Sequence, residues 1–377
     1  MSLDDNHNEM NTSPVSSQRG RRNGLCGFRS FLLAGAGVAV LCGALAWGAA
    51  GQSQGVEPAV GQEQAGSQEP TIRVNVDLVN ILFAVRAKKG GQLIPNLEKN
   101  NFTIYEDGKQ QTIQRFSRET DLPLTLGLLI DISASQERLI DIERQAASAF
   151  FSSVIRKKDE AFLISFGKDT DLLQDYTNSA RTLTAALEDL HGDGGTPMIS
   201  RGPIPNVNTG PVPASGTPKG TLLYDAVYLA SNEKLKGEVG RKALVLITDG
   251  DDQGSTYNIR TAIEAAQRAD AIIYSIYYVD KEFYMRAGMG WGGGGEGELR
   301  KMSEETGGHV FTVSNKHPLN EVFQEIQDEL RNQYSIGYSS TNPNRDGTFR
   351  HIAIKVDNPE YRAQARSGYY ATPNDAQ

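Results

Sequence analysis

The feature that most constrains the fold is a regular alternation of short apolar segments with helical stretches that begins at Leu124. The apolar segments are expected strands: Leu124 to Ile130, Ala161 to Phe166, Ala243 to Thr248, Ala271 to Val279 and His309 to Val313. Continuous apolar strands separated by helices are typical of a parallel sheet covered on both faces. The sequence therefore predicts a doubly wound, mostly parallel α/β domain over residues 121–332.

Helices are expected between these strands. The first follows the first strand, where apolar residues recur at three- and four-residue spacing: Leu139, Ile142, Ala146, Ala149 and Phe150. This spacing predicts that the five side chains line one face of a helix, the apolar stripe that normally faces a core. Later helices are expected at residues 180–190, 222–236, 259–268 and 319–332.

Segments with strand character lie on both sides of the α/β region. Before it, strands are expected from Thr71 to Ala87, then at Phe102 to Tyr105 and Thr112 to Phe116 around an Asp107-Gly108 hairpin turn. After it, strands are expected at residues 333–339, 349–356 and 361–366. Because three strands do not readily stand alone, we expect segments 71–120 and 333–372 to form one small β-sandwich-like unit, into which the α/β domain is inserted.

The first fifty residues have the order of an export signal. Arg19, Arg21 and Arg22 precede an apolar run at 31–47, which small residues ending at Ala50 follow. We expect cleavage after Ala50 and a periplasmic or extracellular protein, with a retained membrane anchor at 31–47 as the alternative. Residues 51–70, rich in Gln, Gly, Ser and Glu, are predicted to be a disordered linker.

Charge and cysteine content exclude several classes of function. The formal net charge of -8 and the pI near 5.3 argue against a nucleic-acid partner, because phosphate binding depends on clustered Lys and Arg. Both cysteines, Cys26 and Cys42, lie in the export region. A mature chain cut after Ala50 would therefore have no thiol for catalysis or for zinc binding.

Hard oxygen atoms gather where two of the expected strands end. Asp131, Ser133 and Ser135 follow the first strand, and Asp249 follows the strand Ala243 to Thr248. Open α/β sheets present their ligand crevice at the carboxyl ends of their strands, and Mg²⁺ prefers one or two carboxylates with neutral oxygens and retained water. The residues can thus converge on a divalent cation, although an Asp and Ser pair could instead cap the following helix.

Three segments, in this order, resemble the metal-ion-dependent adhesion site of von Willebrand factor A (VWFA) domains. They are Asp-x-Ser-x-Ser at 131–135, Gly-Thr-x-x-Tyr-Asp-Ala at 220–226 and Thr-Asp-Gly at 248–250. The resemblance implies a Rossmann-like domain with a metal site formed by Asp131, Ser133, Ser135, Thr221 and Asp249. It also implies that the hydroxyls coordinate the ion directly and the aspartates bind it directly or through water.

The threonine ligand is left open by the sequence. A second Gly-Thr pair occurs at Gly195-Thr196, and the Pro- and Gly-rich stretch 197–219 departs from the compact family pattern. Thr196 is therefore an alternative to Thr221. Asp225, near the start of an expected helix, is interpreted as structural and not as a ligand.

The flanking β segments resemble those of VWFA-related proteins of acidobacteria. The similar segments are 102–116, 333–338 and 366–370, so the resemblance covers about residues 71–372. It implies the architecture more than the function.

The leading functional hypothesis is an exported, metal-dependent protein-binding module without enzymatic activity. A partner's Asp or Glu carboxylate would complete the coordination of Mg²⁺, with Mn²⁺ or Ca²⁺ as alternatives. The sequence contains no Gly-x-Ser-x-Gly elbow or phosphate loop, and its histidines show no metal-binding spacing. The alternatives are a Mg²⁺-dependent, phosphatase-like hydrolase and a structural envelope protein with a vestigial site. Trp291, in a Gly-rich loop, is a candidate for partner contact.

Overall fold

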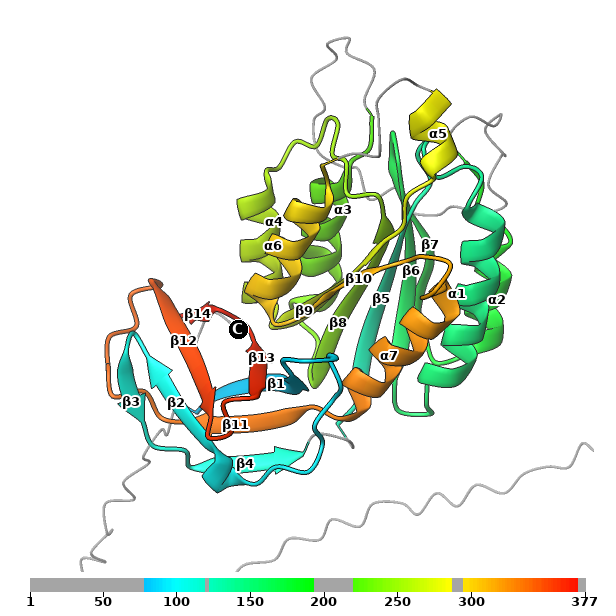
Figure 1. The fold of residues 1–377 in the computed structure, drawn as a ribbon. Helices are drawn as coiled ribbons and strands as arrows, with labels where there is room; N and C mark the ends of the chain where they lie inside the picture. Colours follow the sequence, from blue (N-terminus) through cyan, green and yellow to red (C-terminus); the bar gives the residue numbers. More distant parts are fainter. Residues whose placement is uncertain (1–77, 119–121, 193–219, 287–293, 372–377) are drawn as a thin grey trace, which may run out of the picture. The chain divides into compact units, whose positions relative to one another are not determined.

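The computed structural model describes residues 78–118, 122–192, 220–286 and 294–371 (Figure 1). The predicted export signal and linker, Thr196 and Trp291 lie outside these residues. No helix in the described ranges has both the length and the apolar character needed to span a membrane.

A six-stranded sheet forms the centre of the α/β domain, with the strand order β10-β9-β8-β5-β6-β7. Its strands are β5 (Leu124–Asp131), β6 (Glu160–Phe166), β7 (Thr170–Thr177), β8 (Arg241–Thr248), β9 (Ala271–Tyr277) and β10 (Val310–Thr312). All neighbouring pairs are parallel except β6 and β7, which are antiparallel. The predicted doubly wound, mostly parallel fold is confirmed. The antiparallel edge strand β7 was not expected.

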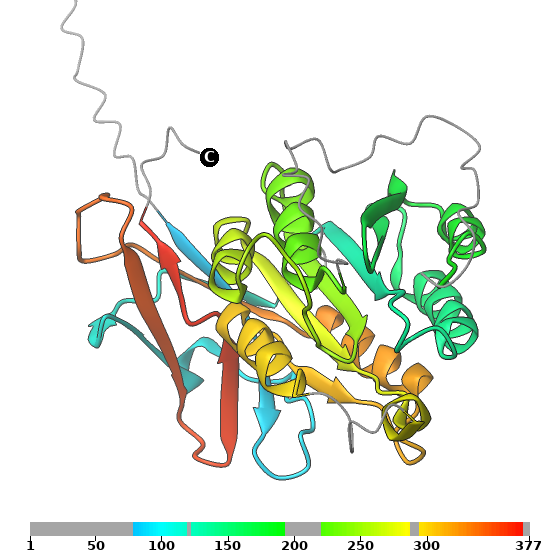
Figure 2. The same ribbon diagram turned by 90° about the horizontal axis from the view of Figure 1, so that it is seen from above.

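Helices cover both faces of this sheet (Figures 1 and 2). On one face lie α1 (Ile140–Val154), α2 (Ala180–Leu187) and α7 (Leu319–Arg331); on the other lie α3 (Leu223–Leu229), α4 (Ile259–Arg268) and α6 (Glu296–Thr306). The helix predicted at 222–236 is α3 followed by a π-helical segment, Ala230–Leu235. The short helix α5 (Lys281–Arg286) and α6 were not predicted, because they flank a Gly-rich stretch.

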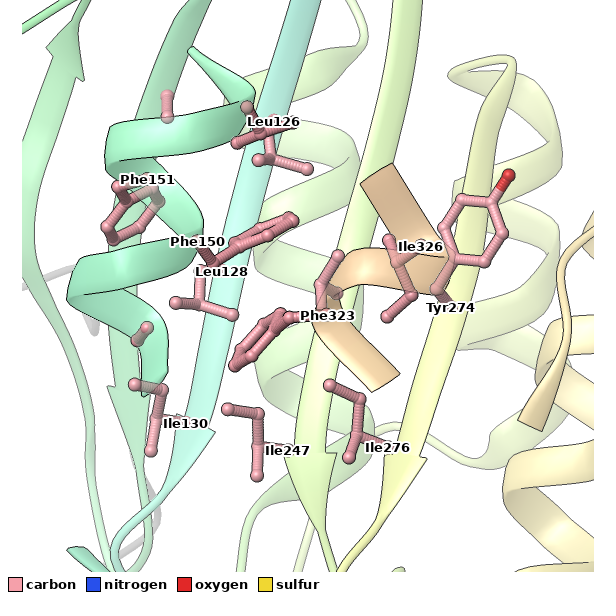
Figure 3. Close-up of a cluster of buried hydrophobic side chains, with 14 of the residues drawn as sticks. Leu126, Leu128, Ile130, Phe150, Phe151, Ile247, Tyr274, Ile276, Phe323 and Ile326 are labelled. Carbon is pink, nitrogen blue, oxygen red and sulfur yellow. The ribbon is translucent and has the colours of Figure 1, made fainter. Parts of the chain in front are cut away.

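The two central strands are buried along their whole length. Every residue of β5 and β8 is buried, as expected for a sheet covered on both faces. Figure 3 shows Phe150 of α1 and Phe323 of α7 side by side over this sheet, near Leu128 and Ile130. Their rings stack with centroids 4.4 Å apart. This packing fixes α1, and hence the loop that precedes it, on the sheet.

The buried face of α1 differs from the predicted one. The buried residues are Ile140, Glu143, Ala147, Phe150, Phe151 and Val154. Of the five residues predicted to share the face, only Phe150 is buried, and Ile142 is 50% exposed. The prediction was wrong because it followed apolar residues only, whereas the real face includes a glutamate.

The flanking segments form two antiparallel four-stranded sheets around a shared core. One has the order β13-β1-β11-β4 and the other β14-β12-β2-β3. Their strands are β1 (Val79–Ala87), β2 (Phe102–Glu106), β3 (Lys109–Gln111), β4 (Arg115–Arg118), β11 (Tyr334–Tyr338), β12 (Phe349–Val356), β13 (Tyr361–Ala365) and β14 (Gly368–Tyr370). Strands β1 and β4 pair with β11, which follows the α/β domain, so the predicted sandwich of N- and C-terminal segments is confirmed. The strand predicted at 112–116 was misplaced, since β3 ends at Gln111 and β4 begins at Arg115.

Candidate metal centre

The ends of the two central strands bring the first aspartate next to a threonine hydroxyl. Asp131 ends β5 and Thr248 ends the neighbouring parallel strand β8, with Ile130 opposite Ile247 in the register. Thr248 Oγ1 donates to Asp131 Oδ2 at 2.5 Å and accepts from Gly250 N at 3.0 Å. Asp131 and Thr248 are fully buried. The sheet register therefore fixes one carboxylate at this edge.

The loop after β5 turns the two serine hydroxyls toward each other. Ser133 N donates to Asp131 Oδ1 at 2.9 Å, and the Ser133 and Ser135 Oγ atoms are 3.1 Å apart. A turn follows, in which Gln136 N donates to Ser133 O at 2.9 Å. Three of the five predicted ligands thus lie within one tight, hydrogen-bonded loop.

The second aspartate, Asp249, is connected to that loop. Asp249 is fully buried, and its Oδ2 accepts hydrogen bonds from Gln136 Nε2 at 3.0 Å and from the Tyr284 hydroxyl at 2.8 Å. Its Oδ1 accepts from Asp251 N at 3.2 Å. Because Gln136 directly follows Ser135, this contact joins the Asp131 and Asp249 loops.

Thr221 lies at the same edge of the sheet, between the loops that follow β6 and β8. Its carbonyl accepts from Gln253 N at 2.8 Å, and the next residue, Leu222, donates to Gly167 O at 2.9 Å. A Cβ on the preceding Gly220 would lie 2.5 Å from the Gln253 Cβ, so the backbone must pack closely there. Strands β6 and β8 flank β5, and Thr221 is therefore on the Asp131 side of the molecule.

Negative charge is concentrated and buried at this site. Burial, together with the charge of Asp249, raises the pKa of Asp131 to about 7. Burial and the charges of both aspartates also raise the pKa of Glu143 well above its usual value. A group whose ionised form is disfavoured in this way is stabilised by a nearby cation.

The residue types fit a divalent cation. Two carboxylates, two converging serine hydroxyls and a nearby threonine supply the hard oxygens that Mg²⁺ prefers. In the described ranges, no three Asp, Glu, His or Cys side chains are arranged to hold an ion by themselves. A cation here would therefore depend on the hydroxyls as well as on Asp131 and Asp249.

Several residues at the site were missed by the sequence analysis. Glu143, Gln136 and Tyr284 are buried polar side chains around the two aspartates. The sequence contained a signal for Glu143. Its helical spacing from Ile140 and Ala147 places it on their face of the helix, and a charged residue is rarely buried there without a partner. Gln136 and Tyr284 had none, because their role depends on loop conformation.

Asp225 has the structural role expected from the sequence. Its Oδ2 accepts from Thr256 N at 3.0 Å and its Oδ1 from Tyr257 N at 2.8 Å. Both carboxylate oxygens thus hold the loop that leads into α4.

The shifted pKa of Asp131 gives a first prediction, for the cation-free protein. Between pH 4 and about 7 the unfolded chain has lost this proton while the folded chain keeps it, so stability falls as the pH rises through this window. In EDTA, the melting temperature should therefore drop by several degrees between pH 5 and pH 8. Thermal unfolding of Asp131→Asn at the same two pH values should show a smaller drop in melting temperature. Equal drops in the two proteins would contradict the assignment.

A close contact between two glycines positions Asp249 and gives a second prediction. A Cβ on Gly295, which precedes α6, would lie 2.3 Å from the Gly250 carbonyl carbon and 2.4 Å from Asp249 O. Gly295→Ala must therefore displace the Asp249 loop, and we expect Mg²⁺ affinity to fall by about tenfold, on the order of 1.4 kcal/mol. Gly297→Ala, two residues further on and inside α6, with nothing within 4 Å of the added Cβ, is the matched control. Calorimetric titrations that give both variants the same affinity would refute this role.

Comparison with known proteins identifies part of the α/β domain. Residues 215–325 match the family model of the von Willebrand factor type A domain. The match includes Thr221 and Asp249 and begins after the Asp131–Ser135 loop. The comparison with curated proteins finds no match to this chain.

Similar solved structures include the following three proteins. One is a variant, with multiple mutations to serines, of an aerotolerance-related membrane protein from Bacteroides fragilis: 16% identity, TM-score 0.38, covering 55% of this chain and 98% of that one. Another is the PilB minor pilin from Streptococcus sanguinis, with 13% identity and a TM-score of 0.38; the match covers 59% of this chain and 64% of the pilin chain. The third is proximal thread matrix protein 1 from the mussel byssus with a zinc-occupied MIDAS motif, with 14% identity and a TM-score of 0.40. This match covers 60% of this chain and 50% of the mussel chain.

Proposed function

We propose that the six-stranded domain, in which residues 215–325 match the von Willebrand factor type A domain, is a metal-dependent protein-binding module. The proposed ligands of a divalent cation are Asp131, Ser133, Ser135, Thr221 and Asp249. The observation that carries the proposal is the hydrogen bond from Gln136 to Asp249, which joins the two aspartate loops around buried negative charge.

The chemistry of these oxygens favours Mg²⁺, with Mn²⁺ and Ca²⁺ as alternatives. When bound, the cation would supply a directed positive charge at the edge of the sheet. A carboxylate from an Asp or Glu of a partner protein would complete its coordination. The residues of this chain hold and orient the ion and take no part in forming or breaking covalent bonds.

Rigidity supports this role. Asp131 is fixed by Thr248 and by the Ser133 backbone, and Asp249 is fixed by Gln136 and Tyr284. Ligands held in this way lose little conformational entropy when the ion and a partner bind. In our proposal the protein is exported and acts in the periplasm or outside the cell, anchored by residues 31–47 if the signal is retained.

The test is capture of a partner from the envelope of the source cell. The immobilised full chain should retain an envelope protein in Mg²⁺ and release it in EDTA, and Asp131→Ala should retain none in either buffer. Acidic side chains of the captured protein, changed to amides one at a time, should include one that is essential for binding. Retention that survives both EDTA and Asp131→Ala would refute the proposal.

A further inference from the structure

Two buried side chains beside the aspartates point to how the cation is selected. Resting on the proposed function, we propose that Glu143 and Gln136 hold water molecules bound to the cation, and thereby favour an ion that keeps its hydration, Mg²⁺, over Ca²⁺. Neither residue belongs to the five proposed ligands. Gln136 lies between the Asp131 loop and α1, and Glu143 lies in the first turn of α1.

Glu143 lies one turn into α1, on the face that packs against the sheet. Its backbone N–H donates to Leu139 O at 3.0 Å, and it lies between Ile140 and Ala147 on the buried face. It has no solvent-exposed surface. Burial, and after it the charges of Asp131 and Asp249, raise the pKa of its carboxyl group, so the group lies within electrostatic reach of both aspartates.

The polar atoms left without partners here are all oxygens. Among the described residues, neither carboxylate oxygen of Glu143 has a hydrogen-bond partner, and the same holds for Gln136 Oε1. The Nε2 atom of that amide donates to Asp249 Oδ2, so the amide lies against one of the proposed ligands. A buried acceptor without a donor costs on the order of 1 to 3 kcal/mol, and more if it is charged. The arrangement therefore favours hydrogen-bond donors at this place.

Water bound to the cation supplies such donors. Direct coordination by Glu143 is not favoured, because no three acidic side chains in the described ranges are arranged to hold one ion. Mg²⁺ usually keeps several waters in an octahedral arrangement, whereas Ca²⁺ takes more oxygen ligands at longer and more variable distances. Acceptors fixed around ordered waters therefore favour Mg²⁺.

Glu143→Leu and Glu143→Gln test the proposal in the full chain. Leu removes both acceptors, whereas Gln keeps the shape and one acceptor oxygen. Residues that orient a metal's surroundings typically contribute about 10- to 100-fold to affinity. We expect Glu143→Leu to weaken Mg²⁺ binding by about tenfold or more and Ca²⁺ binding by less, with Glu143→Gln between it and the wild type. Calorimetric titrations with MgCl₂ and with CaCl₂ measure both.

Thermal unfolding supplies a second readout, the gain in melting temperature on adding Mg²⁺, which a purely structural role of Glu143 would not change. In EDTA, Glu143→Leu should melt above the wild type, because it removes a buried carboxylate without a partner. Its further gain in melting temperature on adding Mg²⁺ should be smaller. Asp141→Asn is the matched control: it removes the same charge from the same helix, at a side chain that is 83% exposed.

The outcomes separate this inference from the proposed function. If Asp131→Asn abolishes cation binding while both Glu143 variants bind Mg²⁺ like the wild type, only the role of Glu143 is wrong. Equal losses for Mg²⁺ and Ca²⁺ would overturn the selectivity. If the wild-type chain binds neither ion, the proposed function and this inference fail together.

Discussion

Asp131→Asn should abolish the stabilisation of the folded protein by Mg²⁺. The wild-type side chain is fully buried and lies between Thr248 and the Ser133 backbone. Asn keeps its shape but removes the charge that attracts the ion. We expect Mg²⁺ affinity to fall at least about a hundredfold, on the order of 3 kcal/mol, and the Mg²⁺-dependent rise in melting temperature to disappear.

Asp141→Asn controls for the change in net charge. This exposed residue pairs with Arg144 on the surface of α1, and its variant should respond to Mg²⁺ like the wild type. Differential scanning fluorimetry over a range of MgCl₂ concentrations, with EDTA as the zero point, measures all three proteins. A full Mg²⁺ response in Asp131→Asn would remove this aspartate from the site.

Arg350→Met should produce the second large effect, on the stability of the β-sandwich. Arg350 and Glu106 are each 2% exposed, and Arg350 Nη1 donates to Glu106 Oε1 at 3.2 Å. Met keeps the apolar volume but leaves Glu106 as a buried carboxylate without its cation, which typically costs about 3–5 kcal/mol. The urea midpoint of the transition that reports on the sandwich should fall accordingly.

Lys355→Met is the matched control for this substitution. Lys355 is exposed on the same strand, β12, where its ammonium lies 4.7 Å from the Tyr105 ring. Loss of an exposed cation there should change stability by about 1 kcal/mol or less. Equal midpoints for the two variants would mean that the buried pair contributes nothing specific.

The buried carboxyl groups of Glu106 and Glu143 are accommodated in opposite ways. Glu106 has an arginine of the same chain and the hydroxyls of Tyr338 and Tyr369, at 2.7 and 3.0 Å. Glu143 has no hydrogen-bond partner among the described residues, and burial together with the charges of Asp131 and Asp249 raises its pKa. Burying charge without compensation is costly, so burial keeps Glu143 protonated in the absence of an ion. A cation bound beside it would instead stabilise its ionised form.

Much of the fold could be predicted because the sheet is encoded locally. The mostly apolar residues of β5 and β8 indicate strands buried on both faces. Parallel neighbouring strands that end in Asp131 and Thr248 necessarily present these residues at one edge of the sheet. The positions of Asp131 and Asp249 at this edge follow from the same register. Their role as metal ligands stays a prediction.

The rest depended on contacts that the sequence pattern does not contain. Glu143 was missed because the buried face of this helix was predicted from apolar residues alone, whereas the buried face of α1 includes this charged residue. Gln136 and Tyr284 donate hydrogen bonds to Asp249 because of the conformation of the segments that carry them, which the sequence pattern does not predict. Thr221 lies at this edge of the sheet, whereas Thr196 lies outside the described residues.

The most direct test of the central claim is a crystal of the protein grown with Mn²⁺, measured for the anomalous scattering of the metal. Our account predicts one strong peak bounded by Asp131, Ser133, Ser135 and Asp249, with a metal-bound water between the ion and Glu143. An empty site at saturating Mn²⁺, or a peak at another place in the chain, would contradict it.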